Sequence, residues 1–199
     1  MNFKSFYEAE QLSDIKRHLK SRGIDFDRTR VIVDEENEYA TFFLYNLSGK
    51  LVGYQRYNPK GVKTKSGGKN TPKSLWRYAS HVTDEGKGKA IAVYGLETYK
   101  FTDPAIWIVE GIFDAVKLHN ENVPAIAVLS NGASPSLVRW LKTLPQTKIV
   151  IHDNDQAGNR LKKLGDVSFA IPSRHKDLGD MPQDEVAEFV NDIKTKMKI

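Results

Sequence analysis

Residues 105–115 read AIWIVEGIFDA, an apolar run that ends in Glu110-Gly111 and resumes at Ile112. The run favours a buried β-strand. A glycine directly after it allows a tight turn and a close approach of other groups to the backbone. Asp114 follows one helical turn later, where it could hold this loop or favour the N-terminus of a helix. On its own, a Glu-Gly pair after a strand serves structure as often as function.

Two further acidic segments follow apolar runs in the same manner. Asp153 and Asp155 come after the run 148–151, and Asp177 comes shortly after the run 167–171. In a parallel α/β sheet, residues just past the carboxyl ends of the strands converge on one crevice. Carboxylates gathered there repel one another unless a cation lies between them, and Mg²⁺ prefers oxygen ligands from carboxylates, water and phosphate. The pattern therefore predicts a Mg²⁺ site for phosphoryl-transfer chemistry.

From residue 105 onward, strand-like and helix-like segments alternate. The predicted strands are 105–109, 124–129, 147–151 and 167–171, and the predicted helices are 112–120, 135–143, 156–164 and 183–196. Ser134 and Pro135 suit the N-cap and the first position of the second helix. Such alternation predicts an α/β fold with a parallel sheet flanked by helices.

The first hundred residues follow a different, mixed α+β pattern. Leu12, Ile15 and Leu19 fall on one helical face, and Gly23 is suited to end that helix. Strands are predicted at 31–33, 40–45 and 51–54, before a mobile loop rich in Pro, Gly and Lys over 58–74. We therefore expect an N-terminal α+β subdomain over residues 1–100 and a compact α/β domain with a C-terminal helix over residues 101–199.

Composition excludes several classes of protein. The chain has 199 residues and no cysteine, which rules out disulfide frameworks, thiolate zinc sites and cysteine nucleophiles. No apolar stretch is long enough for a membrane helix, and residues 1–20 are too polar for a signal peptide. Together these features predict a cytoplasmic protein. The net charge of +5 favours a polyanionic partner.

Positive charge is concentrated in one part of the chain. Residues 50–100 hold 11 Lys or Arg against 3 Asp or Glu, whereas residues 101–199 hold 12 against 13. A run of lysines is often only a solvated face. Here, however, aromatic residues alternate with Arg56 and Arg77, which favours base stacking together with phosphate neutralisation. The interleaved aromatic residues are Tyr54, Tyr57, Trp76 and Tyr78.

Glu110-Gly111, together with Asp153-x-Asp155-x-x-Gly158, resembles the Toprim domain. That domain is shared by bacterial-type primases, type IA and type II topoisomerases, OLD-family nucleases and small maturation ribonucleases. The resemblance covers roughly residues 105–180. It implies that Asp153 and Asp155 are Mg²⁺ ligands and that Glu110 is a metal ligand or a general acid/base. The Lys-Asp pair at 176–177 is similar to a primase segment after the last strand, which implies Asp177 as a further ligand.

Four segments ahead of this domain are similar to bacterial and phage primases in their order and spacing. They are residues 15–23, residues 49–56, residues 77–80, and Lys89 with residues 93–96. The resemblance implies the catalytic core of a DnaG-type primase in its compact, phage-like form. It also implies that Arg56, Arg77 and Lys89 line the template and nucleotide channel. Lys73 and Tyr78 are further expected contacts to DNA or nucleotide.

The function that this resemblance implies is Mg²⁺-dependent synthesis of short RNA primers from NTPs on single-stranded DNA, with Mn²⁺ as a substitute ion. Primases of this type usually carry a zinc ribbon, and many carry a helicase or helicase-binding domain. A chain without cysteine cannot form the usual ribbon, so no zinc is expected, and it has no Walker glycine-rich loop. We therefore expect a replicative helicase or another replisome protein as partner, in a bacterial or phage-infected cytoplasm.

Two other functions remain open from the sequence. The first is a Toprim nuclease, in which the same carboxylates activate water instead of a primer hydroxyl. The second is a non-enzymatic adaptor for single-stranded DNA or the replisome that keeps a primase-like shape. The segments at 15–96 disfavour the nuclease, and the complete acidic set disfavours the adaptor, because clustered carboxylates without a ligand cost stability.

Overall fold

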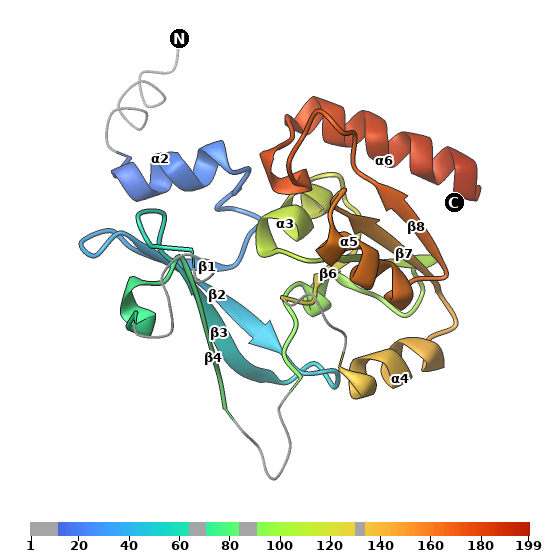
Figure 1. The fold of residues 1–199 in the computed structure, drawn as a ribbon, viewed down its shortest axis with the longest axis horizontal. Helices are drawn as coiled ribbons and strands as arrows, with labels where there is room; N and C mark the ends of the chain where they lie inside the picture. Colours follow the sequence, from blue (N-terminus) through green and yellow to red (C-terminus); the bar gives the residue numbers. More distant parts are fainter. Residues whose placement is uncertain (1–11, 64–70, 84–90, 130–133) are drawn as a thin grey trace. The chain divides into compact units, whose positions relative to one another are not determined.

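The computed structural model describes residues 12–63, 71–83, 91–129 and 134–199 (Figure 1). By compactness, the chain divides into two units. The first comprises Met1–Phe43 and Tyr54–His81, and the second comprises Leu44–Gly53 and Val82–Ile199. The α/β fold class predicted from the sequence is confirmed. The domain boundary predicted near residue 100 stays a prediction.

The first described element is the helix α2, Asp14–Ser21. Ile15 and Leu19 are buried on its inner face, as their spacing predicts. Gly23 follows with φ of 88°, a left-handed conformation that glycine adopts at little cost, and it ends the helix as predicted.

Four strands form a sheet in the order β1-β2-β3-β4. They are β1 Val31–Asp34, β2 Tyr39–Tyr45, β3 Leu51–Tyr57 and β4 Tyr78–Val82. β1 and β2 are antiparallel, with Val31 opposite Phe42. Along β2, Ala40, Phe42 and Leu44 are buried, so alternate side chains enter the core. The first three strands were predicted from the sequence, whereas β4, a short strand at the edge of the sheet, was not.

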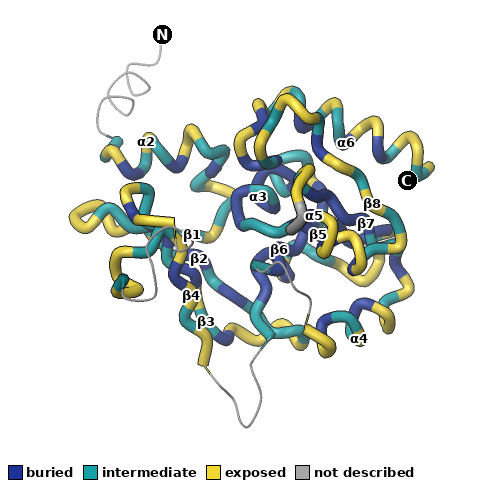
Figure 2. The backbone as a smooth tube through the Cα atoms, in the orientation of Figure 1, coloured by how far each residue is buried: buried dark blue, intermediate teal, exposed yellow. Residues whose placement is uncertain are grey.

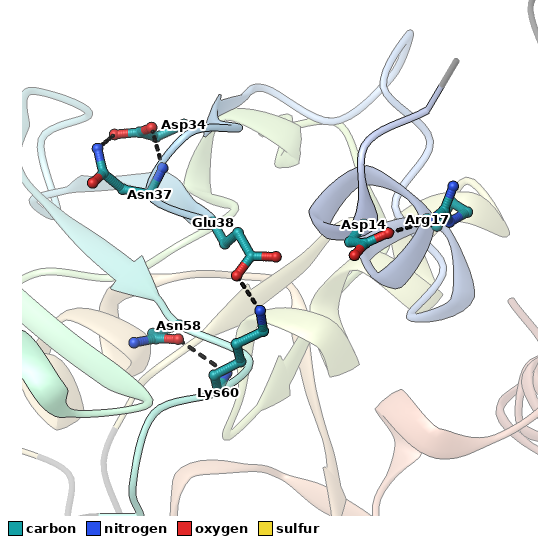
Figure 3. A network of polar contacts seen from close by, with 7 residues as sticks. All are labelled: Asp14, Arg17, Asp34, Asn37, Glu38, Asn58 and Lys60. Atoms are coloured by element: carbon teal, nitrogen blue, oxygen red, sulfur yellow. Dashed lines mark hydrogen bonds and ion pairs between the residues drawn. The ribbon is translucent and has the colours of Figure 1, made fainter. Parts of the chain in front are cut away.

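Polar contacts close the turns of this region (Figure 3). The carboxylate of Asp34 accepts hydrogen bonds from the backbone and side-chain nitrogens of Asn37, at 2.9 and 3.0 Å, and so stabilises the turn after β1. Lys60 forms an ion pair with Glu38, and its backbone nitrogen donates to Oδ1 of Asn58 at 2.9 Å. Lys60 is therefore already paired, although it lies in the segment predicted to be a mobile basic loop.

The rest of that segment is also partly structured. Val62 forms a β-bridge with Trp76. The short 3₁₀ helix η1, Lys73–Leu75, directly precedes Trp76 in the sequence. Of the other lysines of the predicted loop, Lys63 is exposed, whereas Lys65 and Lys69 lie outside the described residues.

The surroundings of His18 predict that its contribution to the stability of the fold depends on pH. Its Nε2 lies 2.8 Å from the hydroxyl of Tyr57. Burial first, and then the charges of Arg22 and Arg77, hold its pKa below the ordinary value of 6.5. At this position the unfolded state therefore binds more protons near that pH, so the contribution of His18 to the free energy of unfolding should fall as the pH drops below 6.5.

Urea unfolding between pH 8 and pH 5 checks this expectation. Relative to wild type, His18→Gln should gain stability as the pH falls from 8 to 5, because it removes this titrating group. His81→Gln, which removes a second histidine of the same unit, is the matched control. Parallel profiles for wild type and His18→Gln would contradict the assignment to His18.

The second unit is built on a parallel sheet of order β6-β5-β7-β8. Its strands are β5 Ala105–Val109, β6 Ala125–Ala127, β7 Thr147–His152 and β8 Val167–Ala170. In register, Trp107 of β5 lies opposite Ala125 on one side and Ile149 on the other. All five residues of β5 are buried (Figure 2). A strand covered on both faces is continuously apolar, which is why the run 105–109 is a strong strand signal.

Helices follow these strands at the predicted places. They are α3 Ile112–Asn120, α4 Pro135–Thr143, α5 Gln156–Leu161 and α6 Gln183–Met197, with the 3₁₀ helices η2 Leu96–Thr98, η3 Lys162–Leu164 and η4 Leu178–Asp180. The hydroxyl of Ser134 caps α4 by accepting from the backbone nitrogen of Leu137 at 3.1 Å. The predicted helix 156–164 becomes 3₁₀ after Leu161. No helix in the described ranges is both long and apolar enough to cross a membrane.

Alternate residues of the sheet define one continuous core. Ile106, Ile108, Ile126 and Val150 pack with α4, α5 and η3 through a cluster of buried leucines. These are Leu137, Leu141, Leu161 and Leu164. α3 packs against η4 and α6 instead. Trp107 is buried as predicted, and Trp140 is half-buried beside the core cluster.

Candidate active site

The order of the parallel strands identifies a candidate ligand site at the carboxyl ends of the two central strands. β5 comes first along the chain, β6 pairs on one side of it, and β7 pairs on the other. The winding direction therefore reverses between β5 and β7. In open α/β sheets, ligands bind outside the carboxyl ends of the strands at such a reversal. Glu110 directly follows β5 and Asp153 directly follows β7, so two of the predicted acidic residues flank this point.

Glu110-Gly111 connects β5 to α3. The backbone oxygen of Glu110 accepts from the nitrogen of Leu129 at 2.9 Å, which ties the residue to the segment after β6. Gly111 is the N-cap of α3, and its nitrogen donates to Oδ2 of Asp114 at 3.0 Å. A β-carbon at position 111 would lie 2.8 Å from that oxygen. A larger residue here would therefore require the Asp114 carboxylate to shift.

Asp153, Asn154 and Asp155 form the loop between β7 and α5. Oδ1 of Asp155 caps α5 by accepting from the nitrogen of Gly158 at 2.8 Å. The side-chain amide of Asn154 donates to the backbone oxygen of Ile171 at 2.9 Å and so tethers the loop to the end of β8. Asn154 was not predicted as a site residue, because no local pattern reveals a partner 17 residues away.

His152 and Gly158 complete the loop. His152 is buried at the end of β7, as expected for a packing residue, and its Nδ1 lies 2.9 Å from the backbone oxygen of Asp153. A β-carbon on Gly158 would lie only 2.1 Å from that same oxygen. The start of α5 therefore packs so closely on the Asp153 backbone that only glycine fits.

Asp177 lies after β8 and precedes η4. Its Oδ2 forms an ion pair with Nζ of Lys176 at 3.1 Å. Its Oδ1 is buried and has no hydrogen-bond partner among the described residues. A buried carboxylate oxygen without a partner costs stability, and a cation is one ligand that would satisfy it.

Electrostatic coupling links the acidic segments. The pKa of Asp153 is raised to about 6, by burial first and then by the charges of Asp177, Glu110 and Asp155. Lys176 acts in the opposite direction. The carboxylates after β5, β7 and β8 therefore lie close enough to repel one another, as the sequence predicts, and a divalent cation would relieve that repulsion.

The donor atoms fit a hard divalent cation, although the arrangement is open. Carboxylate oxygens are the preferred ligands of Mg²⁺, and one carboxylate oxygen of Asp177 has no hydrogen-bond partner among the described residues. Within the described ranges, however, no three acidic or histidine side chains are grouped closely enough to hold one ion. The predicted ligand set of Glu110, Asp153, Asp155 and Asp177 therefore stays a prediction.

The predicted nucleic-acid contacts that the structure describes lie on β3, η1 and β4 and just before β4. The guanidinium of Arg56 lies 4.4 Å from the ring centre of Tyr39, a cation–π contact. Nε of Arg77 donates to the backbone oxygen of Gly61 at 3.1 Å. Tyr78 is 40% exposed, and Lys73 is exposed as well. These contacts fix the arginines in place, whereas Lys89 lies outside the described residues. The binding roles of all five residues stay predictions.

Comparison with known proteins agrees with the arrangement of the second sheet. Residues 107–166 match the family model described as Toprim-like. This segment of the second unit is therefore similar to Toprim-like domains. The matched segment runs from β5 through α5 and η3 and contains Glu110, Asp153 and Asp155. No curated protein matches the chain.

Solved structures of primases resemble most of the chain in fold. The Aquifex aeolicus primase, with zinc-binding and RNA polymerase domains, matches 94% of this chain at a TM-score of 0.68 and 15% identity. A DnaG catalytic domain bound to single-stranded DNA matches 92% at 0.57 and 17% identity. The primase fragment of the bacteriophage T7 primase-helicase matches 77% at 0.53 and 14% identity.

The chain spans 56%, 59% and 62% of those three structures, respectively. At such low identity, the likeness concerns the fold. The Toprim-like domain thus lies within the fold of a DnaG-type primase catalytic core, as the sequence predicts.

Proposed function

We propose that this chain is the catalytic core of a DNA primase, which joins ribonucleotides into short primers on a single-stranded DNA template. The observation that carries the proposal is the position of Glu110 and Asp153 at the strand reversal of a Toprim-like sheet. The charge of Asp177, which has one buried oxygen without a hydrogen-bond partner among the described residues, acts on Asp153. Phosphoryl transfer requires charge neutralisation at such a site more than it requires covalent chemistry.

Asp153, Asp155 and Asp177 would hold Mg²⁺, with Glu110 as a fourth ligand or as the general base. The bound ion would neutralise the incoming triphosphate and assist in-line attack by the primer 3′-hydroxyl. The contribution of the surrounding residues is to hold the acidic side chains in position. The Asn154 tether and the Gly158 contact hold the Asp153 loop against β8 and α5. As general base, Glu110 would accept the hydroxyl proton at its carboxylate.

A primer-synthesis assay tests the proposal. Purified protein with single-stranded DNA, NTPs and Mg²⁺ should produce short oligoribonucleotides, with a replicative helicase or a zinc-bearing recognition protein added where it is needed. The absence of product in every such mixture would contradict the proposal. Cleavage of labelled DNA or RNA without NTPs, if abolished by Asp153→Asn, would identify a nuclease instead. Unchanged biological activity of Asp153→Asn and Asp155→Asn would identify an adaptor.

A salt titration tests the proposed contacts to the template. Lys73→Gln should weaken binding of single-stranded DNA modestly and lower the slope of log affinity against log salt by about 0.7, the value for one lost phosphate contact. Lys60→Gln is the matched control, because Lys60 is ion-paired with Glu38 and a phosphate contact would first require that pair to break. Fluorescence anisotropy at several salt concentrations measures both. Equal slopes for Lys73→Gln and wild type would exclude a phosphate contact at Lys73.

A further inference from the structure

The carboxylate of Asp114 bridges two backbone amides that are far apart in sequence. Its Oδ2 accepts from the nitrogen of Gly111 at 3.0 Å, and its Oδ1 accepts from the nitrogen of Gly179 at 2.8 Å. Gly179 lies 65 residues after Asp114, in η4, and α3 packs directly against that element. The first bond is an ordinary helix cap. The second bond joins a separate part of the chain and needs another explanation.

Both amides lie beside predicted acidic site residues. Gly111 immediately follows Glu110, and Gly179 comes two residues after Asp177. Asp114 therefore connects the segment after β5 with the segment after β8 through a single side chain. Its oxygens are occupied by N–H donors, whereas Oδ1 of Asp177 is buried without a hydrogen-bond partner in the described chain. Both oxygens of Asp114 therefore accept from backbone amides, whereas one oxygen of Asp177 could accept a ligand.

Holding a carboxylate at this position is costly. Burial, followed by the charges of Asp177 and Asp153, raises the pKa of Asp114 to about 7. Asparagine would avoid the charge but has only one acceptor oxygen, and its NH₂ group would face the other N–H donor. Only a carboxylate of this length can accept from both amides. These two hydrogen bonds therefore explain why an aspartate occupies position 114, although the charges of Asp177 and Asp153 disfavour a carboxylate there.

We propose that Asp114 is a positioning residue, which holds the Asp177 segment at a set distance from Glu110 so that the site binds a divalent cation. Asp114 itself does not bind the ion. The inference rests on the proposed function only in assigning that ion to primer synthesis. Residues that orient metal ligands through hydrogen bonds typically change metal affinity by about 10- to 100-fold when they are replaced.

Titration of the metal-free protein with Mn²⁺ alone, followed by electron paramagnetic resonance of the free ion, is the primary test. Asp114→Asn and Asp114→Ala should bind as many ions as the wild type, but about 10- to 100-fold more weakly. The Asn variant should lie between wild type and Ala, because it keeps one acceptor. Asp177→Asn should lose an ion outright. Asp192→Asn, an exposed change on α6, is the matched control and should bind as the wild type does.

Amide hydrogen exchange, measured by NMR without metal, provides a second readout. Exchange at Gly111 and Gly179 should be faster in Asp114→Ala than in wild type. Faster exchange with an unchanged Mn²⁺ affinity would reduce Asp114 to a structural brace and overturn the inference. Loss of an ion in Asp114→Asn would make Asp114 a ligand and would also overturn it. Should Asp114→Ala fail to fold, Asp114→Asn decides the question.

The outcomes separate this inference from the proposed function. A wild-type protein that binds Mn²⁺ but makes no primer in any of the mixtures described above would overturn the primase proposal, while the Mn²⁺ affinities of the variants would still decide the role of Asp114. Primer synthesis by wild type, together with unchanged Mn²⁺ affinity in both Asp114 variants, would overturn the positioning role alone. A wild-type protein that binds no Mn²⁺ would overturn both.

Discussion

Asp153→Asn should reduce primer synthesis to about one-thousandth of the wild-type rate or less. A metal ion at a transferring phosphate stabilises the transition state by several kcal/mol, and about 4 kcal/mol corresponds to a thousandfold in rate. Asp153 directly follows β7 at the strand reversal, and its pKa is raised to about 6 by burial and then by neighbouring carboxylates. Replacing its charge should remove a principal ligand while keeping the shape of the side chain.

The same variant should bind single-stranded DNA as tightly as wild type, or more tightly. The substitution removes a negative charge, and a less negative site repels phosphate less. Anisotropy at two salt concentrations, run beside the primer-synthesis assay, measures both properties. Asp192→Asn, with the same chemical change at an exposed position on α6, should leave both unchanged. Joint loss of synthesis and DNA binding by a folded Asp153→Asn protein would show that the acidic site also carries the binding, and the assignment of roles would be wrong.

Gly158→Ala should destabilise the protein, although alanine usually stabilises a helix. In an ordinary helix, replacing glycine by alanine gains roughly 0.5–1 kcal/mol. Here the new β-carbon would lie 2.1 Å from the backbone oxygen of Asp153, a distance at which the backbone must move. Because the contact is with backbone, the expected net loss is about 1–3 kcal/mol. The displaced segment carries Asp153 and Asp155, so primer synthesis should fall as well.

Urea unfolding and the synthesis assay measure the two effects of Gly158→Ala. Asn159→Ala is the control for the introduction of alanine into α5, because residue 159 is the exposed neighbour and already carries a β-carbon without the close contact. That control should be neutral or slightly more stable than wild type. A Gly158→Ala protein more stable than wild type would show that the loop can relax away from the helix, and that the close packing does not constrain Asp153.

Much of the second unit was predictable because its signals are local. Ser134 and Pro135 mark the start of α4 within two adjacent positions. The run 105–109 is apolar throughout because β5 is buried on both faces. By contrast, β4 was missed, since a short edge strand depends on pairing with β3 more than on its own composition. The loop over 58–74 was predicted to be mobile, yet the bridge from Val62 to Trp76 orders part of it, because strand-like pairing between its ends is invisible in composition.

The acidic residues of the candidate site could be predicted from the sequence, but the strand pairing that brings them together could not. Acidic residues after three strand-like runs, with glycine at 111 and 158, are sufficient to predict which edge of a parallel sheet is polar. They do not specify which strands are neighbours. Glu110 and Asp153 flank one point only because β7 pairs with β5 instead of β6, a choice made by packing across the whole sheet.

The amino-acid sequence by itself determined the α/β class, the places of the strands and helices in the second unit, and the acidic residues that end the strands. Each of these depends on propensities and patterns within a few residues. Only the tertiary structure decided that the side chain of Asp114 accepts from Gly179, that Asn154 tethers its loop to Ile171, and that Lys60 is paired with Glu38. Those contacts join residues 17 to 65 positions apart, and a side chain finds such a partner only after the packing of the elements has brought it within hydrogen-bonding distance.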